Sequence, residues 1–70
     1  MTMRIEDTNE LDSLLLSDFV SVYVDVDSPD GFFKNAELIA VYNNGAFEFY
    51  DEDGEIHSVV FDECKVFTRA

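Results

Sequence analysis

The sequence predicts an α+β fold: a short N-terminal helix packed on a curled antiparallel meander of four to five strands, resembling a small barrel. Three observations predict it. A leucine stripe at helical spacing lies near the N-terminus, alternating apolar and polar residues follow it, and turns containing Gly separate the alternating segments. Seventy residues suffice for one small domain at most, and such a chain buries only about 60% of its unfolded surface. We therefore expect a single domain over residues 1–70.

The helix is expected at about residues 8–17. Asp7 is suited to the N-cap position, since its carboxylate can accept a hydrogen bond from a free backbone N–H group of the first turn. Leu11, Leu14 and Leu15 are spaced i, i+3 and i+4 and form one apolar stripe. A helix of about ten residues is not stable alone in water, so its leucines must pack on the sheet.

The rest of the chain predicts strands and turns. Residues 19–27 alternate, with valines on one side and mostly polar residues on the other. Ser28–Gly31 is a turn or loop, Asn44–Gly45 is a strong hairpin signal, and Asp53–Gly54 is another tight turn. The expected strands are about 19–27, 37–43, 46–51, 55–61 and 64–68, so that His57 and Cys64 lie on neighbouring strands.

The hairpin turns set the register. The Asp53–Gly54 turn could hold two or three residues, and this choice decides which face of the next strand is buried. Both sheet faces carry apolar residues and one helix covers only one, so we expect a strongly curled sheet that also forms a homodimer. With a two-residue Asn44–Gly45 loop, Tyr42 lies opposite Phe47, Ala40 opposite Phe49, Val41 opposite Glu48 and Ile39 opposite Tyr50.

No motif for catalysis or for a cofactor occurs. One His and one Cys, His57 and Cys64, have no evident orienting group, so we expect no enzyme activity. Residues 25–36 fail the calcium-loop pattern at three positions, and one Cys with one His cannot supply four zinc ligands. The acidic tip at residues 51–55 could hold a divalent ion weakly, but a solvated turn is the better interpretation. We expect no metal and no cofactor.

The charge of the chain is its strongest signal. Sixteen Asp and Glu face four Lys and Arg, a net charge of −12, yet 47% of the residues are hydrophobic and 14% aromatic, which excludes a disordered acidic tail. Direct binding to nucleic acid or to an anionic membrane needs clustered Lys and Arg. With only four Lys and Arg in the chain, we expect neither kind of binding. The single Cys, the absence of a signal-peptide core and the short apolar runs favour the cytoplasm.

The excess of carboxylates predicts a basic partner. Solubility of a small domain needs a net charge of only about 2–8. Alternate strand residues such as Asp25 and Asp27 are about 6.6–6.8 Å apart, a spacing on the scale of DNA phosphates, so rows of carboxylates can imitate a duplex. The acids expected to contact a partner are Asp25, Asp27, Asp30, Glu48, Asp51, Glu52, Asp53 and Glu55.

The chain resembles the small acidic DNA-mimic proteins made early by lytic phages. The resemblance lies in length, charge and aromatic-rich strands, and is carried by residues 25–27, 43–45 and 51–55. In length and charge the chain is most similar to the early proteins that inhibit the bacterial histone-like protein HU. The resemblance implies a dimer that occupies the DNA-binding face of HU in the cytoplasm of the host cell.

Two other classes of function stay open. One is an inhibitor of another nucleic-acid enzyme, such as a restriction enzyme, a CRISPR effector or RNA polymerase. The other is a small non-enzymatic adaptor that binds its partner through an apolar sheet face. Salt separates these classes, because binding driven by carboxylates weakens steeply with salt and binding through an apolar face does not.

Overall fold

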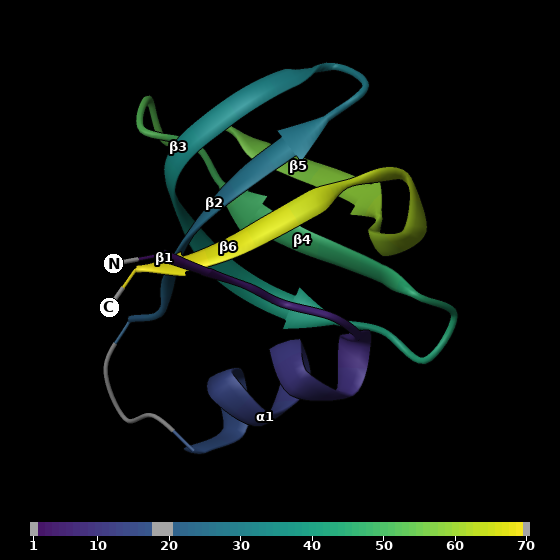
Figure 1. The fold of residues 1–70 in the computed structure, drawn as a ribbon. Helices are drawn as coiled ribbons and strands as arrows, with labels where there is room; N and C mark the ends of the chain where they lie inside the picture. The colour runs from purple at the N-terminus through teal and green to yellow at the C-terminus, as the bar shows by residue number, and fades with distance from the viewer. Residues whose placement is uncertain (1, 18–20, 70) are drawn as a thin grey trace.

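Figure 1 shows the computed structural model of the chain, which describes residues 2–17 and 21–69. Within these residues, six antiparallel strands form one curled sheet in the order β1-β6-β2-β3-β4-β5, and one helix packs against it. The α+β fold class predicted from the sequence is therefore confirmed. The elements are β1 (Thr2–Arg4), α1 (Thr8–Ser17), β2 (Tyr23–Ser28), β3 (Gly31–Val41), β4 (Ala46–Tyr50), β5 (Ile56–Val60), the 3₁₀ turn η1 (Phe61–Glu63) and β6 (Lys65–Arg69).

Helix α1 occupies the residues that the sequence predicted. Asp7 Oδ1 accepts the backbone N–H of Glu10 at 2.9 Å, which is the expected N-cap bond. Leu11 is fully buried, and Leu14 and Leu15 pack against the same core. The helix lies across one end of the sheet and contacts β3. No helix in the described part of the chain is long and apolar enough to cross a membrane.

The last strand leaves the predicted meander. Strands β2 to β5 are consecutive neighbours, but η1 turns the chain away from β5, and β6 pairs with β2 and β1 instead. The expectation that His57 and Cys64 lie on neighbouring strands is therefore wrong. Strand β1 was not predicted, because three residues are too few to show alternation; its pairing with β6 holds it in the sheet.

Strand β3 begins at Gly31, six residues before its predicted start, because Ser28 pairs directly with Gly31 across a two-residue loop. A β-bulge breaks the alternation of apolar and polar residues in this part of the strand, so the sequence did not predict it. One residue of β2, Asp25, lies opposite two residues of β3, Lys34 and Asn35, and Asn35 has a φ of 59°. The extra residue interrupts the alternation and bends the strand. The predicted start of the preceding strand at residue 19 lies outside the described residues.

The predicted register of the next hairpin is wrong by one residue. The N–H of Gly45 bonds the carbonyl of Tyr42 at 3.1 Å, and the N–H of Tyr42 bonds the carbonyl of Ala46 at 2.9 Å. The loop therefore holds three residues, 43–45, with Gly45 at a φ of 89°. Val41 consequently lies opposite Phe47 and Ala40 opposite Glu48, and a bulge at residue 39 then sets Leu38 opposite Phe49 and Glu37 opposite Tyr50.

The β4–β5 loop repeats this geometry. The N–H of Gly54 bonds the carbonyl of Asp51 at 3.0 Å, and the N–H of Asp51 bonds the carbonyl of Glu55 at 2.9 Å. Residues 52–54 thus form a three-residue loop, which settles the choice that the sequence left open. As a result, Phe49 and His57 form a cross-strand pair on the concave face of the sheet.

The core fills this concave face. Phe47 and Phe49 are fully buried with their ring centroids 5.9 Å apart, and Val24 and Val26 are buried beside them, as the alternation predicted. Helix α1 covers one end of the core. The buried apolar residues are Ile5, Leu11, Val24, Val26, Ala36, Leu38, Phe47, Phe49, Phe61, Cys64 and Val66.

We expect Gly45→Ala to lower the free energy of unfolding by about 1–2 kcal/mol, because an L-residue with a side chain strains at positive φ. A Cβ at this position would meet no atom within 4 Å, so the loss is conformational rather than steric. Gly45→Asn is the matched control, since Asn adopts this conformation more readily. Urea unfolding measures both variants, and an equal loss for Asn and Ala would contradict this explanation.

Candidate functional site

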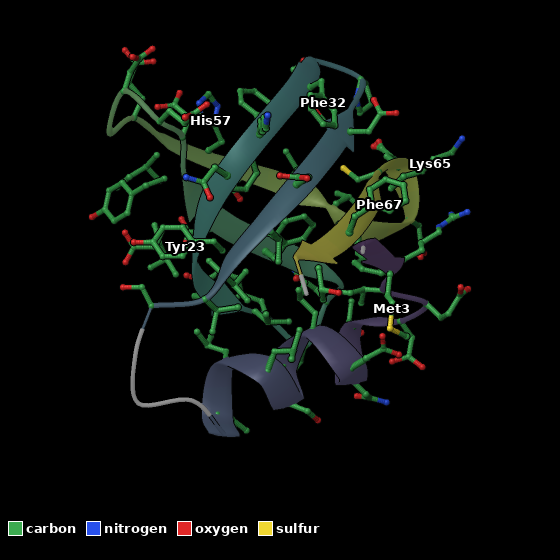
Figure 2. All side chains as sticks on the ribbon, turned by 60° about the vertical axis from the view of Figure 1, so that its left-hand side comes forward. Met3, Tyr23, Phe32, His57, Lys65 and Phe67 are labelled. Atoms are coloured by element: carbon green, nitrogen blue, oxygen red, sulfur yellow. The ribbon has the colours of Figure 1, made fainter. Side chains whose placement is uncertain are left out.

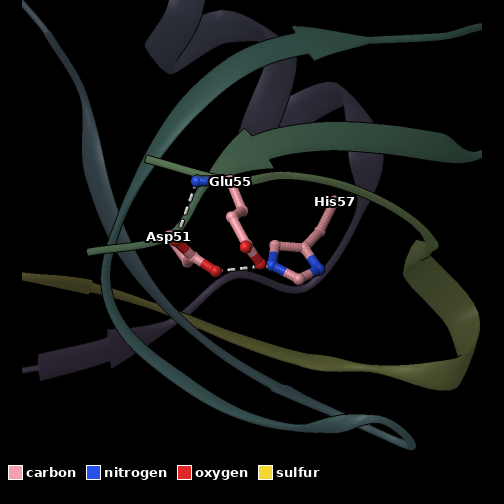
Figure 3. Close-up of side chains that lie close together, drawn as sticks. All are labelled: Asp51, Glu55 and His57. Carbon is pink, nitrogen blue, oxygen red and sulfur yellow. Dashed lines mark hydrogen bonds and ion pairs between the residues drawn. The ribbon is translucent and has the colours of Figure 1, made fainter. Parts of the chain in front are cut away.

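The β4–β5 loop brings three titratable side chains together (Figure 3). His57 Nε2 lies 2.7 Å from Asp51 Oδ2. The other carboxylate oxygen of Asp51 accepts the N–H groups of Asp53 and Glu55 at 2.9 and 3.0 Å. Asp51 therefore closes the loop on one side and holds the imidazole on the other.

Aromatic rings fix the position of His57. Its ring centroid lies 4.5 Å from that of Phe33 and 5.3 Å from that of Phe49. The hydrogen bond from His57 is the largest cause that lowers the pKa of Asp51, and the N–H groups of Glu55 and Asp53 lower it further. The carboxylate of Asp51 thus serves the fold of the loop.

Asp51, Glu55 and His57 are also the residues that could hold a divalent cation. Each offers one ligand atom, and these atoms lie within 4.8 Å of one another. The register explains this convergence, because Asp51 lies opposite Glu55, and residues 55 and 57 point to the same side of the chain. The three ligands are one short of a closed tetrahedral zinc site. The sequence pointed to the acidic tip but missed His57 as a member of this cluster.

Asp25 is placed differently from the other predicted acids. It is 9% exposed, and its Oδ1 accepts the N–H of Asn35 at 2.9 Å. Asn35 is the residue at positive φ in the β3 bulge. This carboxylate stabilises the bend of β3 from beneath, so it is poorly placed to contact a partner protein.

The remaining predicted acids lie on three different parts of the surface. Glu52, Asp53 and Glu55 are exposed on the β4–β5 loop. Glu48, on β4, accepts a hydrogen bond from the hydroxyl of Tyr42, and this bond is the main cause of the raised pKa of Tyr42.

Asp27 and Asp30 lie near the β2–β3 turn. Asp27 projects from the convex face of β2, in register with Lys65 on β6 and Phe32 on β3. Asp30 is exposed in the turn itself. The expected row of carboxylates at positions 25 and 27 is thus broken by the burial of Asp25, and Asp27 remains exposed.

A second acidic region surrounds Cys64 and joins Glu63, which the sequence did not single out, to the predicted acids Asp27 and Asp30. Burial raises the pKa of the Cys64 thiol, and the charges of Glu63, Asp27 and Asp30 raise it further. A thiol in this setting stays protonated at neutral pH and is a poor nucleophile. These residues meet because β6 crosses to β2, which no local pattern could indicate.

The convex face carries an apolar row that the sequence also missed. Tyr23, Glu37, Tyr50 and Ile56 follow one another in register across β2, β3, β4 and β5. The exposed fractions are 45% for Tyr23, 37% for Tyr50 and 58% for Ile56. Figure 2 shows Tyr23 projecting outward at one end of this row, apart from Phe32 and Phe67. The bulges in β3 create the alignment, so it appears only in the folded sheet.

Comparisons of the chain with protein-family models, with curated proteins and with solved structures found no match. The resemblance to DNA-mimic proteins therefore stays a prediction from length, charge and composition.

We expect Asp25→Ala to destabilise the fold by about 1–3 kcal/mol, because it removes a buried carboxylate and leaves the part-buried N–H of Asn35 without its acceptor. Asp27→Ala is the matched control: it removes the same side chain two residues along the same strand, at an exposed position. Its effect should stay within about 0.5 kcal/mol. Thermal unfolding measures both. Equal losses for the two variants would show that the bulge does not depend on Asp25.

We expect the stability conferred by the Asp51 carboxylate to depend on pH. Its pKa is lowered in the folded state, so its contribution is fully present above the unfolded pKa of about 3.9 and is lost as the pH falls through the lower folded value. Asp51→Asn should therefore be less stable than the original chain at pH 6, and the difference should shrink below about pH 4.

Urea unfolding at pH 6, 4 and 3 measures this difference. Glu52→Gln is the control, because it removes a charge from the same loop without removing the bonds that Asp51 makes. A difference between Asp51→Asn and the original chain that is the same at pH 6 and pH 3 would contradict the assignment.

Proposed function

We propose that the protein is a DNA mimic that occupies the DNA-binding surface of a basic host protein, with the nucleoid protein HU as the first candidate. The excess of exposed carboxylates carries this proposal. Among the residues whose side chains the structure describes, ten exposed carboxylates face three exposed cations, Arg4, Lys34 and Lys65. The ten are Glu6, Asp7, Glu10, Asp27, Asp30, Glu52, Asp53, Glu55, Asp62 and Glu63.

The arrangement of these carboxylates around β5 supports the same proposal. Glu52, Asp53 and Glu55 precede the strand, and Asp62 and Glu63 follow it. Five strand residues span about 17 Å, or roughly five axial steps of one DNA strand at about 3.4 Å each. A basic surface that holds several successive phosphates would therefore meet acidic groups at both ends of β5.

The net charge favours fast association with such a partner. A charge of −12 on 70 residues creates a strong negative field, which attracts a basic protein before any contact forms and repels nucleic acid. Association of this kind is expected to weaken as salt is added. Binding of DNA phosphates to a basic protein weakens with salt in the same way, so a mimic and DNA would compete under the same conditions.

The apolar row on the convex face favours a second candidate, an adaptor that binds through this surface. Tyr23, Tyr50 and Ile56 offer exposed apolar area with a single carboxylate, Glu37, among them. The same row is the surface on which the predicted homodimer would form. Binding through it should depend little on salt, so the salt dependence of complex formation separates the two candidates.

A competition gel shift with HU and duplex DNA tests the mimic. We expect micromolar protein to release DNA from HU at low salt. We expect the triple variant Glu52→Gln, Asp53→Asn, Glu55→Gln to compete about 3- to 150-fold less well, from about 0.2–1 kcal/mol for each exposed pair. Asp51 is left unchanged because it holds the loop.

The matched control instead removes three carboxylates in helix α1 and the segment before it, as Glu6→Gln, Glu10→Gln and Asp12→Asn. It should compete nearly as well as the original chain. If the original protein does not release DNA at low salt, HU is not the target. Equal release in high salt, or by both triple variants, would show that imitation of DNA charge by the loop is not the mechanism.

A further inference from the structure

Among residues 2–17 and 21–69, strand β5 pairs with β4 alone and leaves backbone groups unpaired along one edge of the sheet. In an antiparallel pair, successive residues point their N–H and C=O groups alternately toward and away from the partner strand. Glu55 and Phe61 bond residues of the β4 side, through the contacts Asp51 N–H to Glu55 C=O and Phe61 N–H to Gly45 C=O, both 2.9 Å. The odd positions therefore face β4, and the N–H and C=O groups of Ile56, Ser58 and Val60 face away from it.

This edge lacks the usual protection against pairing. Exposed edge strands normally carry charged residues or Pro, or are very short. The five residues of β5 include neither Pro nor Asp, Glu, Lys or Arg, and Ile56 and Val60 are 58% and 46% exposed. The opposite edge, β1, has three residues and carries Arg4. Of the two edges, β5 is the one suited to accept another strand.

A hollow of about 280 Å³ lies beside the second half of β5, between it, the β2–β3 turn and the end of η1; we call it the β5 hollow. Its apolar lining includes Val59, Val60, Cys64 and Pro29. The volume is just below the roughly 300–1,000 Å³ typical of small-molecule sites. It suits a single long side chain.

The charged residues that line the β5 hollow are acidic. Asp30 and Glu63 are both exposed there. Together with Asp27 they raise the pKa of the Cys64 thiol, so their negative charge acts on the hollow itself. Lys65 lies in register with Asp27 on the convex face and does not line the hollow.

We propose that the free edge of β5 binds an extended, basic segment of a partner protein as an additional strand, with one Lys or Arg side chain of that segment in the β5 hollow. The aliphatic stem packs on Val59 and Val60, and the charged group lies between Asp30 and Glu63. Backbone bonds supply affinity in this mode and the side-chain site supplies selectivity. The inference rests on the proposed function in that the partner is basic. A second copy of this chain fits poorly, since its charge is −12.

Labelled peptides test the inference without any DNA-binding protein. The probe is a fluorescein-labelled octapeptide of alternating valine and lysine, and the control peptide has the same charge but proline in place of two valines, so that it cannot pair as a strand. Fluorescence anisotropy should show the valine–lysine peptide binding at least about tenfold more tightly. Amide NMR shifts should change most at Ile56, Ser58 and Val60.

Two variants locate the contact. Ser58→Pro removes an N–H that the fold does not use, and Asp30→Asn with Glu63→Gln removes the charges of the hollow. Each should weaken binding of the valine–lysine peptide about three- to tenfold. Glu6→Gln with Glu10→Gln is the control for the loss of two charges and should change binding less than twofold. The double variant keeps the test decisive if Ser58→Pro disturbs the fold.

The outcomes separate this inference from the proposed function. Equal binding of both peptides would overturn strand addition, and so would tight binding that is unchanged in Asp30→Asn with Glu63→Gln. If the valine–lysine peptide binds as expected while the protein fails to release DNA from HU, the proposed strand addition at β5 is supported. The proposal that the protein competes with DNA for HU is then wrong. If the protein competes with DNA, and Ser58→Pro and the double variant Asp30→Asn with Glu63→Gln compete equally well, the proposed DNA mimicry is supported. Strand addition at β5 is then wrong.

Discussion

The hydrogen bond from the N–H of Asn35 to the buried carboxylate of Asp25 holds the bend on which the rest of the fold depends. At this bulge β3 turns, so that a single strand of 11 residues pairs with β2 along one half and with β4 along the other. The bend also carries Phe33 over the concave face, where it packs on Phe49 and His57. One of the two rings that hold His57 is therefore placed by a bond between residues more than 20 positions earlier in the sequence.

How far the sequence predicts this structure depends on the range of each interaction. Helix α1 was predicted to the residue because its signals, Asp7 and the leucine stripe, are all local. The Asn44–Gly45 pair predicted a hairpin correctly but not its loop length, since two- and three-residue loops both use Gly at positive φ. Neither the bulge at Asn35 nor the crossover of β6 has a local signal, because each depends on a partner strand distant in the chain.

The roles of the individual acidic residues are likewise not predictable from local sequence. Composition established that carboxylates are in excess, but it treats Asp51 and Glu52 alike, although one is committed to three hydrogen bonds within the fold and the other is exposed. Asp25 and Asp27 differ in the same way, two residues apart on one strand. A carboxylate that accepts backbone N–H groups stabilises the fold, whereas one without such partners mainly repels its neighbours. Only the second kind is free to attract a partner, so the functional charge of the chain is smaller than its formal charge.

Exposed acids lie at both ends of β5, and the strand itself contains no Asp, Glu, Lys or Arg. Charges act over a Debye length of about 8 Å at physiological salt, so in the proposed complex the acidic groups at both ends of the strand would orient a basic chain before it touches the protein. Backbone hydrogen bonds act only on contact, and they need an edge whose side chains do not obstruct it. A strand without Asp, Glu, Lys or Arg between two acidic segments suits the proposed partner in both respects. Long-range attraction would set the direction of approach, and the edge at Ile56, Ser58 and Val60 would then fix the register. A charged residue within β5 would protect the edge against unwanted pairing, and its absence here leaves the repulsion between acidic chains as the protection against pairing of β5 with β5 of a second copy.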